Sequence, residues 1–96
     1  MQKEMLHFTA EWCQPCQQSK PIIAQYLELN TDVVYTKIDI DTDLELMEKY
    51  KGLNIMSIPA FVGLYDGVIN RGHSGVPSIE YLDSLFGCGA ANINCD

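Results

Sequence analysis

Trp12-Cys13-Gln14-Pro15-Cys16 is the stretch around which the rest of the chain is organised. Two cysteines separated by two residues can close a small, reversible disulfide, and zinc sites use the same spacing. The nucleophile in thiol–disulfide exchange is the thiolate, so redox chemistry needs a feature that favours the ionised sulfur. We expect that feature here, because the pair lies where a strand leads into a helix. Unpaired backbone N–H groups at a helix N-terminus favour an anion.

Outward from this stretch, the hydrophobic patterns predict seven elements in the order β-α-β-α-β-β-α. The first strand lacks polar/apolar alternation, which is typical of a central strand covered on both faces. The predicted strands are residues 3–8, 33–38, 60–65 and 68–72; the predicted helices are residues 14–29, a segment carrying Leu44 to Tyr50 that stops at Gly52, and residues 79–86. The prediction is an α/β fold with a mixed, mostly four-stranded sheet and helices on both faces.

Turn and cap residues support these boundaries. Asp66-Gly67 predicts a two-residue hairpin, and Pro59 suits the first position of a strand. Thr42 or Asp43 is expected to cap the second helix, and Pro21 is expected to kink the first. Pro77 and Ser78 suit the start of the last helix. We expect one domain over residues 1–87 and a C-terminal tail over residues 88–96.

The composition limits the classes of partner. A net charge of -7 over 96 residues argues against binding to nucleic acid or to an anionic membrane. The acidity fits a soluble protein that meets other proteins, or it serves solubility alone. The apolar run near the N-terminus is too short for a secretory signal or a membrane span, so we expect a cytoplasmic protein. Four cysteines in such a protein indicate redox or metal chemistry.

Residues 4–87 resemble the thioredoxin family. The resemblance rests on residues 10–13 (Ala-Glu-Trp-Cys) with Pro15-Cys16, Pro21, residues 37–41 (Lys-Ile-Asp-Ile-Asp), Ile58-Pro59, Asp66-Gly67 and Gly75. It implies the thioredoxin fold and a thiol–disulfide oxidoreductase that reduces protein disulfides. Cys13 would be the exposed attacking thiolate, and Cys16 the buried thiol that resolves the mixed disulfide.

The same resemblance implies a substrate surface and partners. Pro59 would be a cis-proline facing the cysteine pair, and the Ile58 backbone would pair with substrate. Trp12 and Gly75 would line the docking groove, and Pro15 goes with reducing character. The protein would act as a monomer without a bound cofactor. Electrons would come from a thioredoxin reductase, and substrates would include enzymes such as ribonucleotide reductase.

Three alternatives stay open. A glutaredoxin-like carrier would take its electrons from glutathione. A binding module would use the thioredoxin surface to hold a partner enzyme, with redox chemistry incidental. A zinc site would need Cys88 and Cys95 as further ligands beside Cys13 and Cys16. Cys88 and Cys95 could instead close a second disulfide or be accessory.

The chain departs from the family pattern in three ways. The strand and helix that thioredoxins carry before the central strand are missing, so one sheet edge is expected to be open to water or to a partner. Gln14 replaces a glycine and is expected to alter partner choice more than redox potential. His7 stands where thioredoxins have a buried aspartate, with Lys37 at the usual lysine position. We expect His7 to be neutral, and either to act as or orient water for the base toward Cys16, or to be only a satisfied polar core residue.

Overall fold

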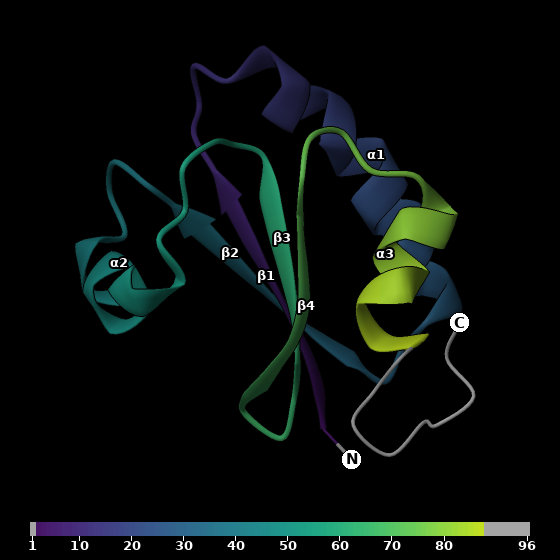
Figure 1. The fold of residues 1–96 in the computed structure, drawn as a ribbon. Helices are drawn as coiled ribbons and strands as arrows, with labels where there is room; N and C mark the ends of the chain where they lie inside the picture. Colours follow the sequence, from purple (N-terminus) through teal and green to yellow (C-terminus); the bar gives the residue numbers. More distant parts are fainter. Residues whose placement is uncertain (1, 88–96) are drawn as a thin grey trace.

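The computed structural model describes residues 2–87 and contains a four-stranded mixed sheet (Figure 1). The strands are β1 (Lys3–Thr9), β2 (Val33–Asp39), β3 (Ala60–Tyr65) and β4 (Val68–Ser74), in the spatial order β2-β1-β3-β4. β1 is parallel to β2 and antiparallel to β3, and β3 is antiparallel to β4. The predicted fold class is therefore confirmed.

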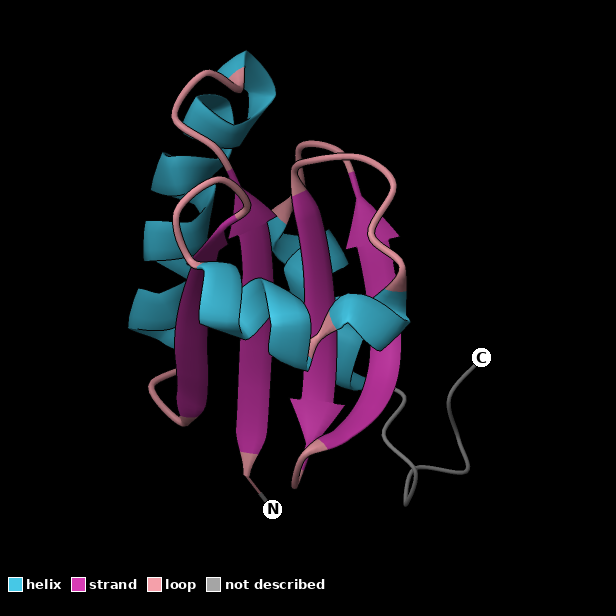
Figure 2. Cartoon of the chain, turned by 90° about the vertical axis from the view of Figure 1, so that its left-hand side faces the viewer, coloured by secondary structure: helices cyan, strands magenta, loops and turns pink. Residues whose placement is uncertain are grey.

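Helices cover both faces of the sheet (Figures 1 and 2). α1 (Gln14–Leu29) and α3 (Ile79–Gly87) pack on one face, and α2 (Leu44–Lys49) packs on the other. The first core cluster lies under α1 and α3; its buried members are Met5, Ile23, Tyr26, Val33, Phe61, Leu82, Leu85 and Phe86. The second lies under α2; its buried members are Leu6, Phe8, Ile38, Ala60, Val62 and Leu64.

The composition of β1 explains why it lies inside the sheet. Its residues alternate between the two core clusters, so Met5 packs under α1 and α3 while Leu6 and Phe8 pack under α2. All residues from Met5 to Thr9 are buried, as the absence of polar/apolar alternation predicted. β1 ends immediately before the cysteine pair and therefore fixes the pair at one edge of the sheet.

The local structure around α2 differs from the prediction. α2 ends at Lys49, and Gly52 lies inside a following 3-10 turn, Lys51–Leu53, so Gly52 is not the helix stop. Asp43 occupies the N-cap position, but its carboxylate accepts the N–H of Asp39 at 2.7 Å and does not cap the helix. This short helix is stabilised by the side chains that it packs against the sheet. The local sequence does not indicate these contacts, so it could not predict where the helix ends.

The remaining turns follow the predicted chemistry. Asp66 and Gly67 both have positive φ, 50° and 83°, as a tight hairpin turn requires. Ser78 accepts the N–H of Tyr81 at 3.1 Å through its hydroxyl, which caps the start of α3. Pro21 lies inside α1. Over residues 2–87, no helix is both long and apolar enough to cross a membrane.

Candidate active site at the start of α1

Cys13 and Cys16 are joined by a disulfide at the N-terminus of α1, with their Cα atoms 5.2 Å apart. Cys13 is the N-cap residue, and its Sγ accepts the backbone N–H of Cys16 at 3.2 Å. A thiolate at Cys13 would gain from the same N–H and from the positive end of the helix dipole. The predicted strand-to-helix position of the pair is confirmed.

The exposure predicted for Cys13 is wrong for this disulfide form. Cys13 is only 4% exposed and Cys16 is fully buried. Both cysteines pack with Ala10, and the half-buried side chains of Ile40 and Ile58 pack against them. The physical reason is the packing of Ala10, Ile40 and Ile58 around the cysteine pair, which excludes water from the Cys13 side chain.

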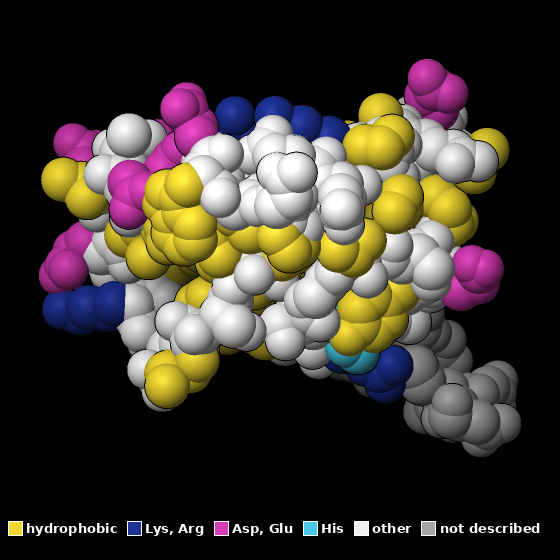
Figure 3. Space-filling model, turned by 90° about the horizontal axis from the view of Figure 1, so that it is seen from above, with side chains coloured by type: hydrophobic (Ala, Val, Ile, Leu, Met, Phe, Trp, Pro, Cys, Tyr) yellow, Lys and Arg dark blue, Asp and Glu magenta, His cyan; other side chains and the backbone are white. Residues whose placement is uncertain are grey.

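An apolar hollow of about 370 Å³ lies beside the disulfide. It is lined by Trp12, Ile40, Met47, Ile55, Met56, Ser57 and Ile58. Trp12 is 68% exposed, and its Nε1–H donates to the Asp41 carboxylate at 2.7 Å. Met56 is 85% exposed. Figure 3 looks onto the end of the molecule where these loops lie and shows hydrophobic side chains gathered across it, with acidic side chains toward its margins.

Pro59, which follows Ile58 of this hollow in the sequence, lies against Gly75. The Ile58–Pro59 peptide bond is cis, and Pro59 is buried. The Gly75 N–H donates to the Pro59 carbonyl oxygen at 2.8 Å, and Gly75 has a φ of 99°, which favours glycine. The main chain of Ile58 makes no hydrogen bond to another residue of the described range.

His7 is buried on the α1 side of the sheet, 1% exposed. Its ring stacks on Phe61 with centroids 4.5 Å apart, and Nδ1 lies 2.7 Å from the Tyr35 hydroxyl. Nε2 is buried without a hydrogen-bond partner among residues 2–87. Burial lowers the pKa of His7, and the charges of Lys37 and then Lys20 add to the effect, so that together they bring it from 6.5 to about 4. The lowered pKa agrees with the neutral state expected for His7, whose role stays a prediction.

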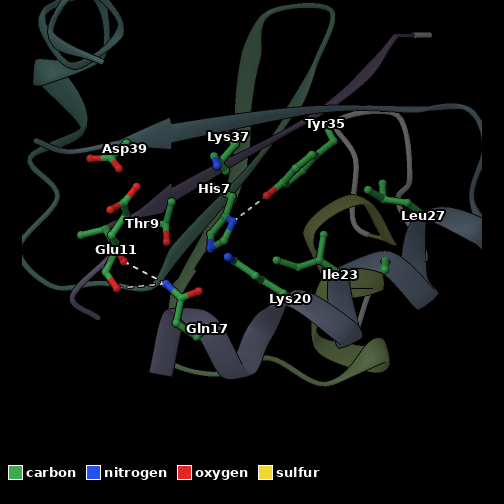
Figure 4. Close-up of a pocket in the computed structure, with 12 residues that line it drawn as sticks. His7, Thr9, Glu11, Gln17, Lys20, Ile23, Leu27, Tyr35, Lys37 and Asp39 are labelled. Carbon is green, nitrogen blue, oxygen red and sulfur yellow. Dashed lines mark hydrogen bonds between the residues drawn. The ribbon is translucent and has the colours of Figure 1, made fainter. Parts of the chain in front are cut away.

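Two residues near His7 were missed by the sequence analysis. Lys37 lies opposite His7 in the β1–β2 register, as expected, but Lys20 of α1 also points at the ring (Figure 4). Lys20 lies four residues after Cys16, so the helical repeat already placed it on the same face of the helix. Tyr35 lies two residues before Lys37, and strand alternation places both on one face of the sheet.

Gln14 and Pro15 lie at the exposed start of α1. Pro15 has no N–H to leave unpaired in the first turn, so it fits there without cost.

Cys88 and Cys95 lie outside the described residues. Within residues 2–87, no group of three or more His, Cys, Asp or Glu side chains could hold a metal ion. The disulfide occupies the two thiols that a zinc site would need.

Comparison with known proteins completes these observations. The family model described as thioredoxin matches residues 1–76. Thioredoxin H-type of Oryza sativa subsp. indica is 36% identical over 63 residues, which are 66% of this chain and 49% of that protein. Thioredoxin H3 of Arabidopsis thaliana is 30% identical over 81 residues, 84% of this chain and 66% of that protein. The chain therefore spans about half to two thirds of these relatives' length.

A solved structure agrees with the fold. The solution structure of oxidised thioredoxin from Plasmodium falciparum superposes with a TM-score of 0.72 and 30% identity. The match covers 88% of this chain and 77% of that one.

Proposed function

Because this chain belongs to the thioredoxin family, we propose that it is a thiol–disulfide oxidoreductase that reduces protein disulfides through Cys13 and Cys16. One observation carries the proposal: the Cys13 sulfur caps α1 and accepts the Cys16 N–H at 3.2 Å. The same position stabilises a thiolate in the reduced protein, and the thiolate is the species that attacks a disulfide.

The reaction proceeds in two exchanges. The Cys13 thiolate attacks one sulfur of the substrate disulfide, forms a mixed disulfide and releases the other substrate sulfur as a thiolate, which takes up a proton. Cys16 then loses its proton and attacks the Cys13 sulfur, which restores the Cys13–Cys16 disulfide and releases the second substrate thiol. The substrate gains two electrons and two protons, and the protein is oxidised to the form described above.

We assign the base for the second exchange to His7. When the ring carries its proton on Nδ1, this N–H donates to the Tyr35 oxygen and leaves the buried Nε2 as an acceptor. A pKa of about 4 makes His7 comparable in basicity to an ordinary aspartate, whose pKa is about 3.9. His7 would take the Cys16 proton directly or through a water, and burial, aided by the charge of Lys37, would hold the ring neutral before that step.

The hollow beside the disulfide is the proposed docking site for substrate. Trp12 supplies an exposed aromatic wall, and the free main chain of Ile58 can pair with an extended substrate segment. Pro59 and Gly75, joined by their hydrogen bond, form the opposite rim. Gln14 borders the cysteines on the exposed start of α1, where it would influence which partners fit.

The partners and setting are part of the proposal. The protein would work without a bound cofactor, and its electrons would come from a thioredoxin reductase or from glutathione. Protein disulfides, such as the one in a ribonucleotide reductase, would be the acceptors. Such a cycle needs a reducing compartment, for which the cytoplasm is the proposed location. Pro15, which restrains the first turn of α1, would favour the reducing direction.

Trapping the intermediate tests the assignment of the two cysteines. Cys16→Ser should form a stable mixed disulfide between Cys13 and a protein substrate such as insulin, because the resolving thiol is absent. Peptide mass mapping of the adduct locates the bond. The matched control Cys13→Ser should accumulate at most a trace of adduct, because Cys16 is fully buried. Equal adduct yields from the two variants would contradict the assigned roles.

A further inference from the structure

A pocket of about 300 Å³ opens between α1 and the carboxyl ends of the parallel strands β1 and β2, separate from the hollow beside Trp12 (Figure 4). Its size is at the lower end of the range used for small ligands. In open α/β sheets, ligands bind next to the carboxyl ends of the strands. We propose that this pocket binds a small monocarboxylate with a short apolar chain.

The first argument is the buried nitrogen of His7. His7 lines the pocket, and its buried Nε2 has no hydrogen-bond partner among residues 2–87, a state that is costly for a buried polar atom unless something satisfies it. Burial raises the pKa of Tyr35 to about 12, so its hydroxyl keeps its proton and can donate to His7 Nδ1. With a carboxylate bound, the neutral ring carries its proton on Nε2 and donates it to a carboxylate oxygen, whereas the base step uses the other tautomer, in which Nδ1–H donates to the Tyr35 oxygen.

The second argument is the positive charge around that nitrogen. Lys20 enters from α1 and Lys37 from β2, and both line the pocket. Their charges act at the His7 ring, where each lowers its pKa. In Figure 4 the Lys20 ammonium points toward the ring from the helix side, and Lys37 lies on the strand side. Among residues 2–87 neither lysine has a salt-bridge partner, so an anion between them would be compensated on both sides.

The two ends of the pocket differ in polarity, which limits the kind of ligand that fits. Ile23 and Leu27 of α1 form an apolar end, and Glu11 and Asp39 lie at the other (Figure 4). A carboxylate between the lysines would direct its chain along Ile23 and Leu27. A second carboxylate at the far end of that chain would meet apolar side chains, and a multiply charged anion would be repelled by Glu11 and Asp39. The site therefore selects a single carboxylate and disfavours a dicarboxylate or a phosphate.

The proposal does not depend on the reductase activity and is testable on the oxidised full chain. We would titrate ¹⁵N-labelled protein with hexanoate, adipate and hexan-1-ol at constant pH and ionic strength, and follow the amide signals of β1, β2 and α1. Hexanoate should give saturable shifts at these signals. Adipate and hexan-1-ol should bind at least about fivefold more weakly, the factor expected when about one exposed ion pair is lost or opposed.

Matched variants locate the site. Lys20→Gln and Lys37→Gln should each weaken hexanoate binding about fivefold. Lys49→Gln removes an exposed lysine from α2 on the other face of the sheet and should change nothing. Absence of saturable hexanoate binding would overturn the proposal, and so would equal binding of hexanoate and hexan-1-ol. An unchanged affinity in both Lys20→Gln and Lys37→Gln would overturn it as well.

Discussion

The buried imidazole of His7 links the folding stability of the protein to pH. In the folded chain its pKa falls from 6.5 to about 4, chiefly because burial disfavours the charged ring. Between these values the unfolded chain binds a proton that the folded chain does not bind. The contribution of His7 is therefore complete above pH 6.5 and is lost as the pH falls toward 4.

We predict that wild-type protein loses about 3 kcal/mol of unfolding free energy relative to His7→Gln between pH 7 and pH 4. Glutamine does not titrate, so the difference between the two curves isolates the histidine from the carboxylates. Urea unfolding at several pH values measures it. A difference that stays constant over this range would show that His7 keeps its ordinary pKa in the fold.

The proposed role of His7 as a base predicts a separate kinetic effect. His7→Gln should slow the release of substrate from the mixed disulfide at least about tenfold, because Cys16 loses its proton acceptor. The first attack by Cys13, measured in the Cys16→Ser background, should be unchanged by the same substitution. If release is equally fast with and without His7, the ring is a structural residue only.

At the scale of elements, α1 and β3 position the site in different ways. The Cys13 sulfur lies at the N-terminus of α1, where it accepts a backbone N–H of the first turn. This N–H and the positive end of the helix dipole would stabilise the thiolate. β3 follows Pro59 directly and is held against α3 by a close approach at Gly63. A Cβ at Gly63 would lie 2.8 Å from both the Cβ and the carbonyl oxygen of Leu85, and the backbone atom cannot move without shifting α3.

We therefore predict that Gly63→Ala lowers the unfolding free energy by about 1–3 kcal/mol through overpacking. Gly52→Ala is the matched control, because a Cβ there meets no atom within 4 Å. Its effect should stay within about 0.5 kcal/mol. Equal effects of the two substitutions in chemical denaturation would show that β3 and α3 are not packed as closely as described.

At the scale of the whole molecule, the sequence predicted the elements that long patterns define. The bounds of α1 and β3 agree with the prediction. The helical repeat extends over the sixteen residues of α1, and the apolar run of β3 ends at the turn Asp66-Gly67, so both patterns define where the elements begin and end. The end of α2 was mispredicted, since this helix of six residues has no fully buried side chain and its length depends on what it packs against.

In the candidate site, too, the residues that belong to sequence motifs were predicted, and those whose position depends on packing were not. Motifs predicted the two cysteines, Trp12, Ile58, Pro59 and Gly75. The structure joins the cysteines in a disulfide, places Trp12 and Ile58 in the adjoining hollow, and links Pro59 to Gly75 by a hydrogen bond. Tyr35 and Lys20 were not, because their relation to His7 depends on packing among β1, β2 and α1. The burial of Cys13 was also missed, since it depends on Ile40 and Ile58, which are distant in sequence.

The domain boundary at residue 87 remains a prediction. Every core residue described here lies between Met5 and Phe86. The described fold and the proposed docking surface therefore lie within the range expected for the domain.

The most direct test of the central claim is insulin disulfide reduction with dithiothreitol as the electron source, followed by turbidity. Catalytic amounts of the protein should shorten the lag several-fold, and Cys13→Ser should remove the effect. Replacing dithiothreitol by glutathione, or by NADPH with a thioredoxin reductase, then identifies the donor. A wild-type rate equal to that of the Cys13→Ser/Cys16→Ser double variant would contradict the account and leave the protein a binding module.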